Sequence, residues 1–378
     1  MSNIKVLYLF VTSICNAKCH FCFYGEELNK KEDLSFDELE QFSKNLGRIN
    51  SLMISGGEPF TRKDLHKVVT LFHKNNKIKY VSIPTNGSLV DRSLKQIKEI
   101  CSNKDLFVRI QISLDDFADV HDSIRKVPEG FKKAIDLISK IKILKKTYPN
   151  LSVSVSSVLS SFNKDTAVNF SNYVNDLNVD DHNVEIERPT LGTISEDDSE
   201  LSKWSNNAWR EQMTSIVNIF KSVVNLNIQR YSLNNHEKKY RLGIIGPLLR
   251  EIMVKLQFKI KNNLILNGKK WPMNCVAGKK SLVIDHNGTF RACEMRSAIG
   301  NIKNYDLNFK NIYDSAEYKN ELETIKKVQC WKNCTHGCNI GLSIQYNKFS
   351  LLIVFKEALK TVLSRVKFIF LKKYDGLS

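Results

Sequence analysis

Three cysteines near the amino terminus are spaced so that they can bind one metal centre. Cys15, Cys19 and Cys22 lie within eight residues, with three and then two residues between them. His20 could complete a four-ligand zinc site, but its position directly beside Cys19 makes a shared tetrahedron awkward. Three thiolates suit a 4Fe–4S cluster with one iron left open for a substrate or cofactor. The spacing therefore indicates such a cluster.

Five further cysteines form a second group near the carboxyl terminus. They are Cys275, Cys293, Cys330, Cys334 and Cys338. A hairpin with strands over 281–285 and 289–292 and a turn over 286–288 is expected to bring the first two toward each other. On spacing alone, four of these cysteines, or three with His336, fit a structural zinc site as well as an iron–sulfur cluster.

The remaining cysteine, Cys101, ends a predicted helix and is interpreted as an ordinary buried thiol. The cysteines number nine, which is odd, and no export signal is visible. A disulfide framework is therefore a poor interpretation.

Apolar runs typical of buried strands alternate with helical patterns over residues 1–190. Strands are expected over 5–12, 52–55, 80–84, 107–114, 151–159 and 184–187, and helices over 35–45, 64–75, 92–100, 130–146 and 165–177. Ser35 and Glu38 make a capping-box pattern at the first helix. Six such units predict an α/β fold of parallel strands with helices outside, which is a partial (β/α)6 TIM-like barrel.

Polar and glycine-rich segments follow these strands at their carboxyl ends. They are the cysteine loop, Gly56–Pro59, Thr85–Gly87, Ser113–Asp115, Ser156–Ser160 and Glu187–Pro189. Each segment alone fits a common turn or helix cap. Together they would share one rim with the cysteine loop, and ligands bind at that rim in parallel α/β barrels.

The segment CNAKCHFC, Cys15–Cys22, resembles the cluster-binding loop of the radical S-adenosylmethionine (radical SAM) superfamily, including the aromatic Phe21 before the last cysteine. The resemblance implies that the open iron chelates the amino and carboxyl groups of the methionine moiety. The cluster then donates an electron, the sulfonium C–S bond breaks, and a 5′-deoxyadenosyl radical abstracts hydrogen from the substrate. A flavodoxin- or ferredoxin-type electron donor is implied as partner.

The same resemblance gives the glycine-rich turn a role in binding SAM. Gly56, Gly57, Glu58 and Pro59 correspond to the turn that binds the methionine amino group, since glycines let backbone carbonyls approach a ligand closely. Glu58 is expected to support that edge. At the same depth lie Thr85 and Asn86.

Other rim residues are expected to bind the remainder of SAM. Ser113 and Asp115 can hydrogen-bond the ribose hydroxyls. Arg188 is placed to pair with the methionine carboxylate through a charge-assisted contact. Arg125 is also expected to reach the ligand, although an ordinary surface arginine is an equal alternative.

The second cysteine group resembles the start of the SPASM and Twitch auxiliary iron–sulfur domains found after radical SAM barrels. The resemblance rests on Cys275, on Cys293 and on Gly288 five residues before it. The full SPASM pattern has seven cysteines for two clusters, whereas this group has five. The resemblance therefore implies one auxiliary 4Fe–4S cluster, with Cys275, Cys293 and Cys338 as firm ligands and Cys334 or Cys330 as the fourth.

Four regions are expected: a core barrel over 1–190, a helical linker over 191–270, an auxiliary cluster domain over 271–348, and a basic amphipathic helix over 349–378. Leu352, Phe355, Leu359, Leu363 and Phe370 fall near one stripe of that last helix, among several lysines and arginines. This stripe could lie on an anionic membrane or pack on the protein's own barrel.

The composition limits the class of protein and its partners. Lysine and arginine number 57 against 40 acidic residues, so the net charge is +17 and an anionic partner is favoured. No apolar run is long enough to span a bilayer, and we expect a cytoplasmic protein, with peripheral membrane contact at most.

The function expected is that of a radical SAM enzyme that oxidises or otherwise modifies its substrate. Because the cluster loop begins at residue 15, we expect no peptide-binding domain before the barrel, which favours a sugar-like, lipid-linked or other small substrate over a peptide. A peptide maturase of the same superfamily is the first alternative. A zinc and nucleic-acid binding module is the second, but nucleic acid is not expected because the basic residues are scattered and no binding motif is present.

Overall fold

The computed structural model describes residues 3–187, 216, 218–223 and 245–375. Its strands are β1 (Val6–Phe10), β2 (Ser51–Ser55), β3 (Tyr80–Thr85), β4 (Phe107–Ser113), β5 (Leu151–Leu159), β6 (Asp181–Ile186), β7 (Ser281–Ile284), β8 (Thr289–Arg291) and β9 (Gly300–Asn301). Its helices are α1 (Phe36–Leu46), α2 (Leu65–Asn76), α3 (Val90–Cys101), α4 (Ala118–Arg125), α5 (Gly130–Leu144), α6 (Ala167–Asp176), α9 (Ile245–Asn267), α10 (Phe309–Asp314), α11 (Ala316–Val328), α12 (Gly337–Tyr346) and α13 (Ser350–Asp375).

The described strands form one sheet in the order β6-β5-β4-β3-β2-β1-β7-β8-β9. β1 to β6 pair in parallel in chain order, which confirms the predicted α/β barrel core. β7 pairs in parallel with β1, and β7, β8 and β9 continue as an antiparallel meander. The predicted hairpin is therefore present, and it extends the sheet of the barrel.

β1 is buried on both faces, as a strand in the middle of a covered parallel sheet must be. Leu7 and Leu9 belong to the large core beneath the helices. Val6, Tyr8 and Phe10 belong to a second cluster on the opposite face of the sheet. This two-sided burial explains why the segment VLYLF is an uninterrupted apolar run.

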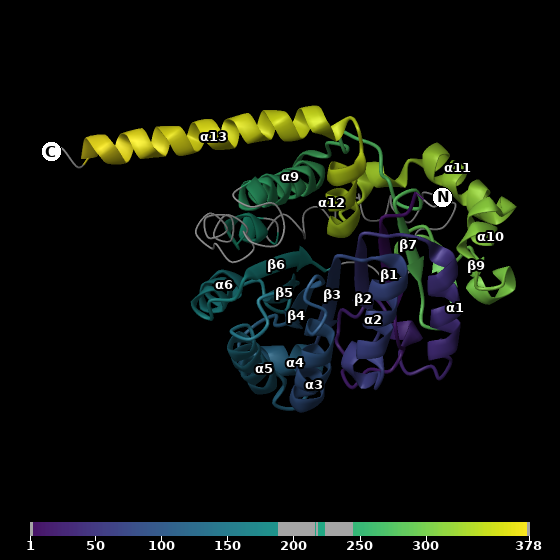
Figure 1. The fold of residues 1–378 in the computed structure, drawn as a ribbon. Coiled ribbons are helices and arrows are strands. Elements are labelled where there is room, and N and C mark those ends of the chain that lie inside the picture. Colours follow the sequence, from purple (N-terminus) through teal and green to yellow (C-terminus); the bar gives the residue numbers. More distant parts are fainter. Residues whose placement is uncertain (1–2, 188–215, 217, 224–244, 376–378) are drawn as a thin grey trace.

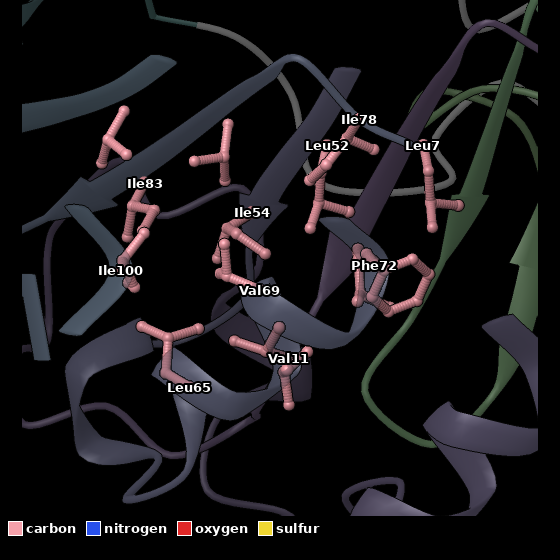
Figure 2. Packing of buried hydrophobic residues seen from close by; sticks show 14 of the residues in the cluster. Leu7, Val11, Leu52, Ile54, Leu65, Val69, Phe72, Ile78, Ile83 and Ile100 are labelled. Carbon is pink, nitrogen blue, oxygen red and sulfur yellow. The ribbon is translucent and has the colours of Figure 1, made fainter. Parts of the chain in front are cut away.

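Helices α1 to α6 cover one side of the sheet, and α9, α12 and α13 cross the other side (Figure 1). α2 directs Leu65, Val69 and Phe72 at the strands, since residues at this spacing share one helix face (Figure 2). The predicted capping box is present: the backbone N–H of Glu38 donates to Ser35 Oγ at 3.2 Å, and that of Ser35 donates to Glu38 Oε2 at 2.8 Å.

The segments after the barrel are only partly described. α9 lies within 191–270, the region expected to be a helical linker, of which 191–215, 217 and 224–244 lie outside the described residues. α9 packs against α12 and α13 around Ile252, Leu256 and Ile340. Cys101 ends α3 and is fully buried, as predicted.

The barrel and the β7–β9 meander share one hydrophobic core. Ile284 and Phe290 of the meander belong to the same buried cluster as Leu7 of β1 and Leu52 of β2. Phe290 is fully buried, and its ring contacts Tyr305 and Tyr318. The two parts are therefore expected to unfold as one cooperative unit.

We expect Phe290→Ala to lower the free energy of unfolding by about 3–5 kcal/mol, because truncation of a buried phenylalanine leaves a cavity. Urea unfolding followed by far-UV circular dichroism and by tryptophan fluorescence should show one shared, shifted transition. Ile143→Ala, at a side chain on α5 that is 64% exposed, is the control and should change stability by less than about 0.5 kcal/mol. Two separate transitions, only one of them shifted, would contradict a shared core.

Candidate functional site

A cavity of about 1260 Å³ brings the two predicted cysteine groups to one space. Cys15, Cys19 and Cys22 line it from the amino-terminal loop, and Cys334 and Cys338 line it from the carboxyl-terminal part. The other predicted ligand-binding residues in its wall are Phe21, Gly56, Gly57, Glu58, Pro59, Thr85, Asn86, Ser113 and Arg125. The structure therefore gathers most of the predicted site.

Five predicted residues are not placed in this wall, namely Cys275, Cys293, Cys330, Asp115 and Arg188. Asp115 is buried beside the cavity with its carboxylate directed at Arg125. Arg188 lies outside the described residues, which stop at Glu187 on this side of the gap.

The three amino-terminal thiols are half-buried on a loop that backbone hydrogen bonds hold. The N–H groups of Lys18 and His20 donate to the carbonyls of Arg125 and Ile124, each at 3.1 Å. The N–H of Ala17 donates to Cys15 Sγ at 3.4 Å. Burial raises the pKa of the Cys15 thiol to about 12, so a bound cation is needed to hold it as thiolate at neutral pH.

Gly56 and Gly57 let the turn after β2 lie directly against the cysteine loop. A Cβ at Gly56 would overlap the carbonyl oxygen of Thr12, and one at Gly57 would overlap that of Ile14. Gly56 also has a φ of +122°, which disfavours any side chain. The N–H of Gly57 donates to Thr12 O and that of Glu58 to Ile14 O, both at 2.8 Å. The two glycines were predicted to let backbone groups approach a ligand; in the structure they let the turn after β2 lie close to the cysteine loop.

Glu58 organises the ends of two neighbouring strands rather than pointing into solvent. Its carboxylate accepts from the N–H of Phe60 at 3.1 Å, the N–H of Asn86 at 2.7 Å and the hydroxyl of Thr85 at 2.9 Å. Burial raises the pKa of Glu58 to about 7, although these hydrogen bonds and Arg125 act to lower it. Asn86 in turn donates to the side chain of Asn16 at 2.8 Å, so the strand ends hold the cysteine loop from below.

Arg125 connects β4 to the cysteine loop. Its Nε and Nη2 donate to the two oxygens of Asp115 at 2.6 and 3.0 Å. Its Nη1 lies 3.8 Å from Cys19 Sγ, and its guanidinium lies 5.6 Å from the ring centre of Phe21. Asp115 thus holds Arg125, and its contact with a ribose stays a prediction.

Four of the carboxyl-terminal cysteines gather together. Burial raises the pKa of the Cys275 thiol to about 12, and it raises that of the Cys330 thiol further. In both cases the nearby thiols of Cys293 and Cys334 raise the pKa as well. The sulfurs of Cys275, Cys293 and Cys334 each accept the N–H of the residue two positions later at 3.4 Å, as Cys15 does. This repeated N–H···S geometry suits sulfurs that carry negative charge on a metal.

Cys338 is exposed and lines the cavity, beside the Tyr8 hydroxyl of β1 and the His336 ring. Cys293 interacts with the same two groups. His336 Nε2 also lies 3.2 Å from Glu294 Oε2, with both side chains buried. The prediction that Cys338 is a ligand of the auxiliary cluster stays a prediction.

Within the described ranges, no three His, Cys, Asp or Glu side chains converge tightly enough to bind a single metal ion.

A ladder of polar side chains inside the barrel was not predicted. Ser82 donates to Gln111 at 2.9 Å, Arg109 Nε donates to Ser154 Oγ at 3.0 Å, and Arg109 pairs with Asp181. The signal was available, because these polar residues alternate with apolar ones along β3, β4, β5 and β6. The interior of the barrel is therefore suited to a polar ligand.

Comparison with protein families identifies two regions. Residues 9–168 match the model described as the radical SAM superfamily, and residues 275–339 match the SPASM model, described as an iron–sulfur cluster-binding domain. Both matches include the cysteines of the corresponding thiol group.

Curated relatives match part of this chain. GTP 3′,8-cyclase of Aquifex aeolicus is 33% identical over 25% of this chain and 32% of its own length. GTP 3′,8-cyclase of Alkaliphilus oremlandii is 25% identical over 65% of this chain and 74% of its own length. The chain spans about a third to a half of the length of the first relatives it matches.

Solved structures match over almost the whole chain. Native anSMEcpe with bound AdoMet and Cp18Cys peptide is 18% identical, and the match covers 96% of this chain and 98% of that one with a TM-score of 0.56. SuiB of Streptococcus suis bound to S-adenosylmethionine is 16% identical, with coverage of 91% and 75% and a TM-score of 0.54. At these identities the likeness establishes a common fold.

His121 generates a prediction about acid stability. It is buried, its Nδ1 accepts the backbone N–H of Asp115 at 3.2 Å, and burial lowers its pKa to about 4. Between pH 6.5 and 4 the unfolded chain therefore binds a proton that the folded chain does not. Stability is full above pH 6.5 and should fall by about 3 kcal/mol by pH 4 through this residue.

His121→Gln keeps a hydrogen-bond acceptor for Asp115 but cannot titrate, so its stability should fall less over the same pH range. Urea unfolding at several pH values between 4 and 7 measures both proteins. His73→Gln, which replaces a histidine paired with exposed Asp105, is the control. Parallel stability curves for the wild type and His121→Gln would show that His121 does not cause the acid sensitivity.

Proposed function

Because this chain belongs to the radical SAM superfamily and carries a SPASM domain, we propose that it is an enzyme that oxidises a polar substrate held between two iron–sulfur sites. The observation that carries the proposal is the shared cavity, whose wall contains Cys15, Cys19 and Cys22 together with Cys334 and Cys338 of the second group. A substrate in this space would be near both groups.

The amino-terminal site fits a SAM-binding 4Fe–4S cluster. Cys15, Cys19 and Cys22 would supply three ligands, and no fourth cysteine belongs to this loop. In the superfamily such a cluster cleaves SAM reductively, and the 5′-deoxyadenosyl radical formed takes a hydrogen atom from the substrate.

The protein's own residues position this site. The backbone of Gly56–Pro59 and the side chain of Ser113 face the cavity where SAM would bind, and Arg125 contributes positive charge beside Cys19. Asp115 holds Arg125 through two hydrogen bonds, and Glu58 holds the ends of β2 and β3. We propose that Arg188 completes the site by pairing with the methionine carboxylate.

For the auxiliary cluster we propose Cys275, Cys293, Cys330 and Cys334 as ligands. These four thiols are mutual neighbours, and three of them share the N–H···S geometry of Cys15. A cluster held by these four thiols would supply an acceptor for the second electron of a two-electron oxidation. Cys338 remains free to face the substrate.

The polar lining of the cavity favours a polar substrate. The cavity of about 1260 Å³ would hold SAM and the amino-terminal cluster as well as the substrate. A peptide is one candidate, supported by the peptide bound in anSMEcpe, a protein of the same fold. A lipid-linked sugar is the second, supported by Leu351 and Val354 of α13, which bring an apolar helix to the cavity wall.

An electron donor of the flavodoxin or ferredoxin type would reduce the amino-terminal site. Outside the cavity, exposed Phe162 stacks on His20 beside Cys19, with the ring centres 5.1 Å apart. We propose this flat surface as the approach for the donor.

Replacing the three loop cysteines should remove the amino-terminal cluster and leave the auxiliary cluster in place. Wild-type protein reconstituted with iron and sulfide under anaerobic conditions should bind about eight iron atoms and form 5′-deoxyadenosine with dithionite and SAM. The variant Cys15→Ser/Cys19→Ser/Cys22→Ser should keep about four iron atoms and form no 5′-deoxyadenosine. Cys101→Ser, at a buried cysteine away from both groups, is the control and should keep both properties. Nucleoside formation by the triple variant would refute the proposal.

Single replacements in the second group should identify its ligands. Cys330→Ser should reduce the iron bound by the auxiliary site and change its electron paramagnetic resonance spectrum, whereas Cys338→Ser should leave both unchanged. The opposite pattern would show that Cys338 is a ligand and Cys330 the spare cysteine.

A further inference from the structure

The two faces of α13 have the reverse of the polarity expected for a helix at a protein surface. The face that packs on α9 and α12 carries Ser350, Ile353, Val354, Glu357, Ala358 and Thr361, which are buried or half-buried. The opposite, exposed face carries Leu351, Leu352, Phe355, Leu359 and Leu363. The outer face is therefore more apolar than the inner one.

The exposure of this outer face is large. Leu352 is 61% exposed, Phe355 67%, Leu359 53% and Leu363 58%, and Phe349 just before the helix is 77% exposed. Positions 352, 355, 359 and 363 recur every three or four residues, so their side chains form one continuous stripe. Single exposed leucines are ordinary, but a stripe of this kind marks an interaction surface.

Packing on the protein's own barrel, which the sequence left open, does not cover the stripe. α13 already uses its other face for that contact, with Lys259 of α9 pairing with Glu357 at 3.4 Å. Figure 1 shows α13 running across the molecule and extending past α9 toward the carboxyl terminus. The stripe is thus left facing outward.

The charges around the stripe indicate what covers it. Lys348, Lys356 and Lys360 are exposed beside it, and the helix continues in sequence with Arg365, Lys367, Lys372 and Lys373. Only Glu357 and Asp375 oppose them, and Glu357 is paired inward with α9. A second copy of this helix would bring these cations together, whereas an anionic surface would neutralise them.

We propose that the outer face of α13 docks the enzyme on an anionic lipid bilayer. The leucines and Phe355 would enter the boundary between headgroups and acyl chains, with the helix parallel to the surface and the lysines among the phosphates. None of the described helices, α13 included, is long and apolar enough to cross a membrane, so the contact is peripheral.

Docking would also place the cavity beside the bilayer, since Leu351 and Val354 at the start of α13 belong to its wall. This consequence rests on the proposed function and favours a membrane-anchored substrate. The docking itself rests only on the described surface of α13 and can be tested without any catalytic assay.

Sedimentation of the full-length protein with lipid vesicles tests the proposal. Wild-type protein should bind vesicles that contain phosphatidylglycerol and bind pure phosphatidylcholine vesicles much more weakly. Leu352→Glu/Leu359→Glu should weaken binding to the anionic vesicles by at least about tenfold, because apolar insertion is lost and charge repulsion is added. Lys356→Gln/Lys360→Gln should weaken it by roughly fivefold per lysine.

Two control variants show whether a change of charge elsewhere on the surface has the same effect on vesicle binding as a change on the outer face of α13. Ile143→Glu adds a carboxylate at another exposed apolar residue, and Lys326→Gln/Lys327→Gln removes two exposed cations on α11. Both controls should bind as the wild type does. Retained formation of 5′-deoxyadenosine without lipid shows that the α13 variants are folded.

Two outcomes would overturn the proposal. One is that the wild type does not bind the anionic vesicles, or binds them no better than neutral ones. The other, measured by light scattering without lipid, is that the wild type is a dimer and Leu352→Glu/Leu359→Glu is a monomer, which would make the stripe a contact between two copies of the chain.

Discussion

The parallel pairing of β7 with β1 is the constraint on which the site depends. It aligns Val6 with Ser281 and Leu9 with Ile284, so the second cysteine group is attached to the strand that leads into the first. Tyr8 of β1 then lies beside Cys338, and Tyr24 after the cysteine loop hydrogen-bonds His286 of the β7–β8 turn at 2.6 Å. Because the two thiol groups share one sheet and one core, their separation is fixed by packing and not by a linker.

Backbone contacts, more than side chains, hold the amino-terminal loop in place. Gly56 and Gly57 permit carbonyl and N–H groups of two loops to meet, and the loop is held from the other side by the end of α4. Arg125, the last residue of α4, then reaches both Asp115 and Cys19. A flexible loop with three thiols would lose much conformational entropy on binding a cluster, and this arrangement reduces that loss in advance.

Much of the barrel could be predicted because its strands are buried on both faces and its helices are strongly one-sided. β5 and the β7–β8 hairpin begin and end close to the predicted residues for this reason. α4 was missed, because a helix of eight residues gives too short a period to recognise. The attachment of β7 to β1 could not be predicted either, since nothing local in SLVI states which edge it will join.

Within the site, the residues at the rim were easier to predict than the groups that their side chains contact. The rim residues were found from their positions after strands, but the contacts of Asp115 with Arg125 and of Cys338 with Tyr8 and His336 were not predicted. Periodicity places a residue at the correct edge, but the direction of its side chain depends on neighbours far away in sequence. Arg125 illustrates this point, because its partners come from β4 and from a loop more than a hundred residues earlier.

The contacts in the structure also indicate which side chains carry the net positive charge of the protein. Arg125 is paired with Asp115, Arg109 with Asp181 and Lys261 with Glu185, so these buried pairs around the cavity add nothing to the net charge. The excess of 57 basic over 40 acidic residues, which is 17, is therefore carried by other side chains, the exposed lysines of α13 among them. The exposed lysines of α13 are therefore one place on this protein where an anionic partner is expected to bind.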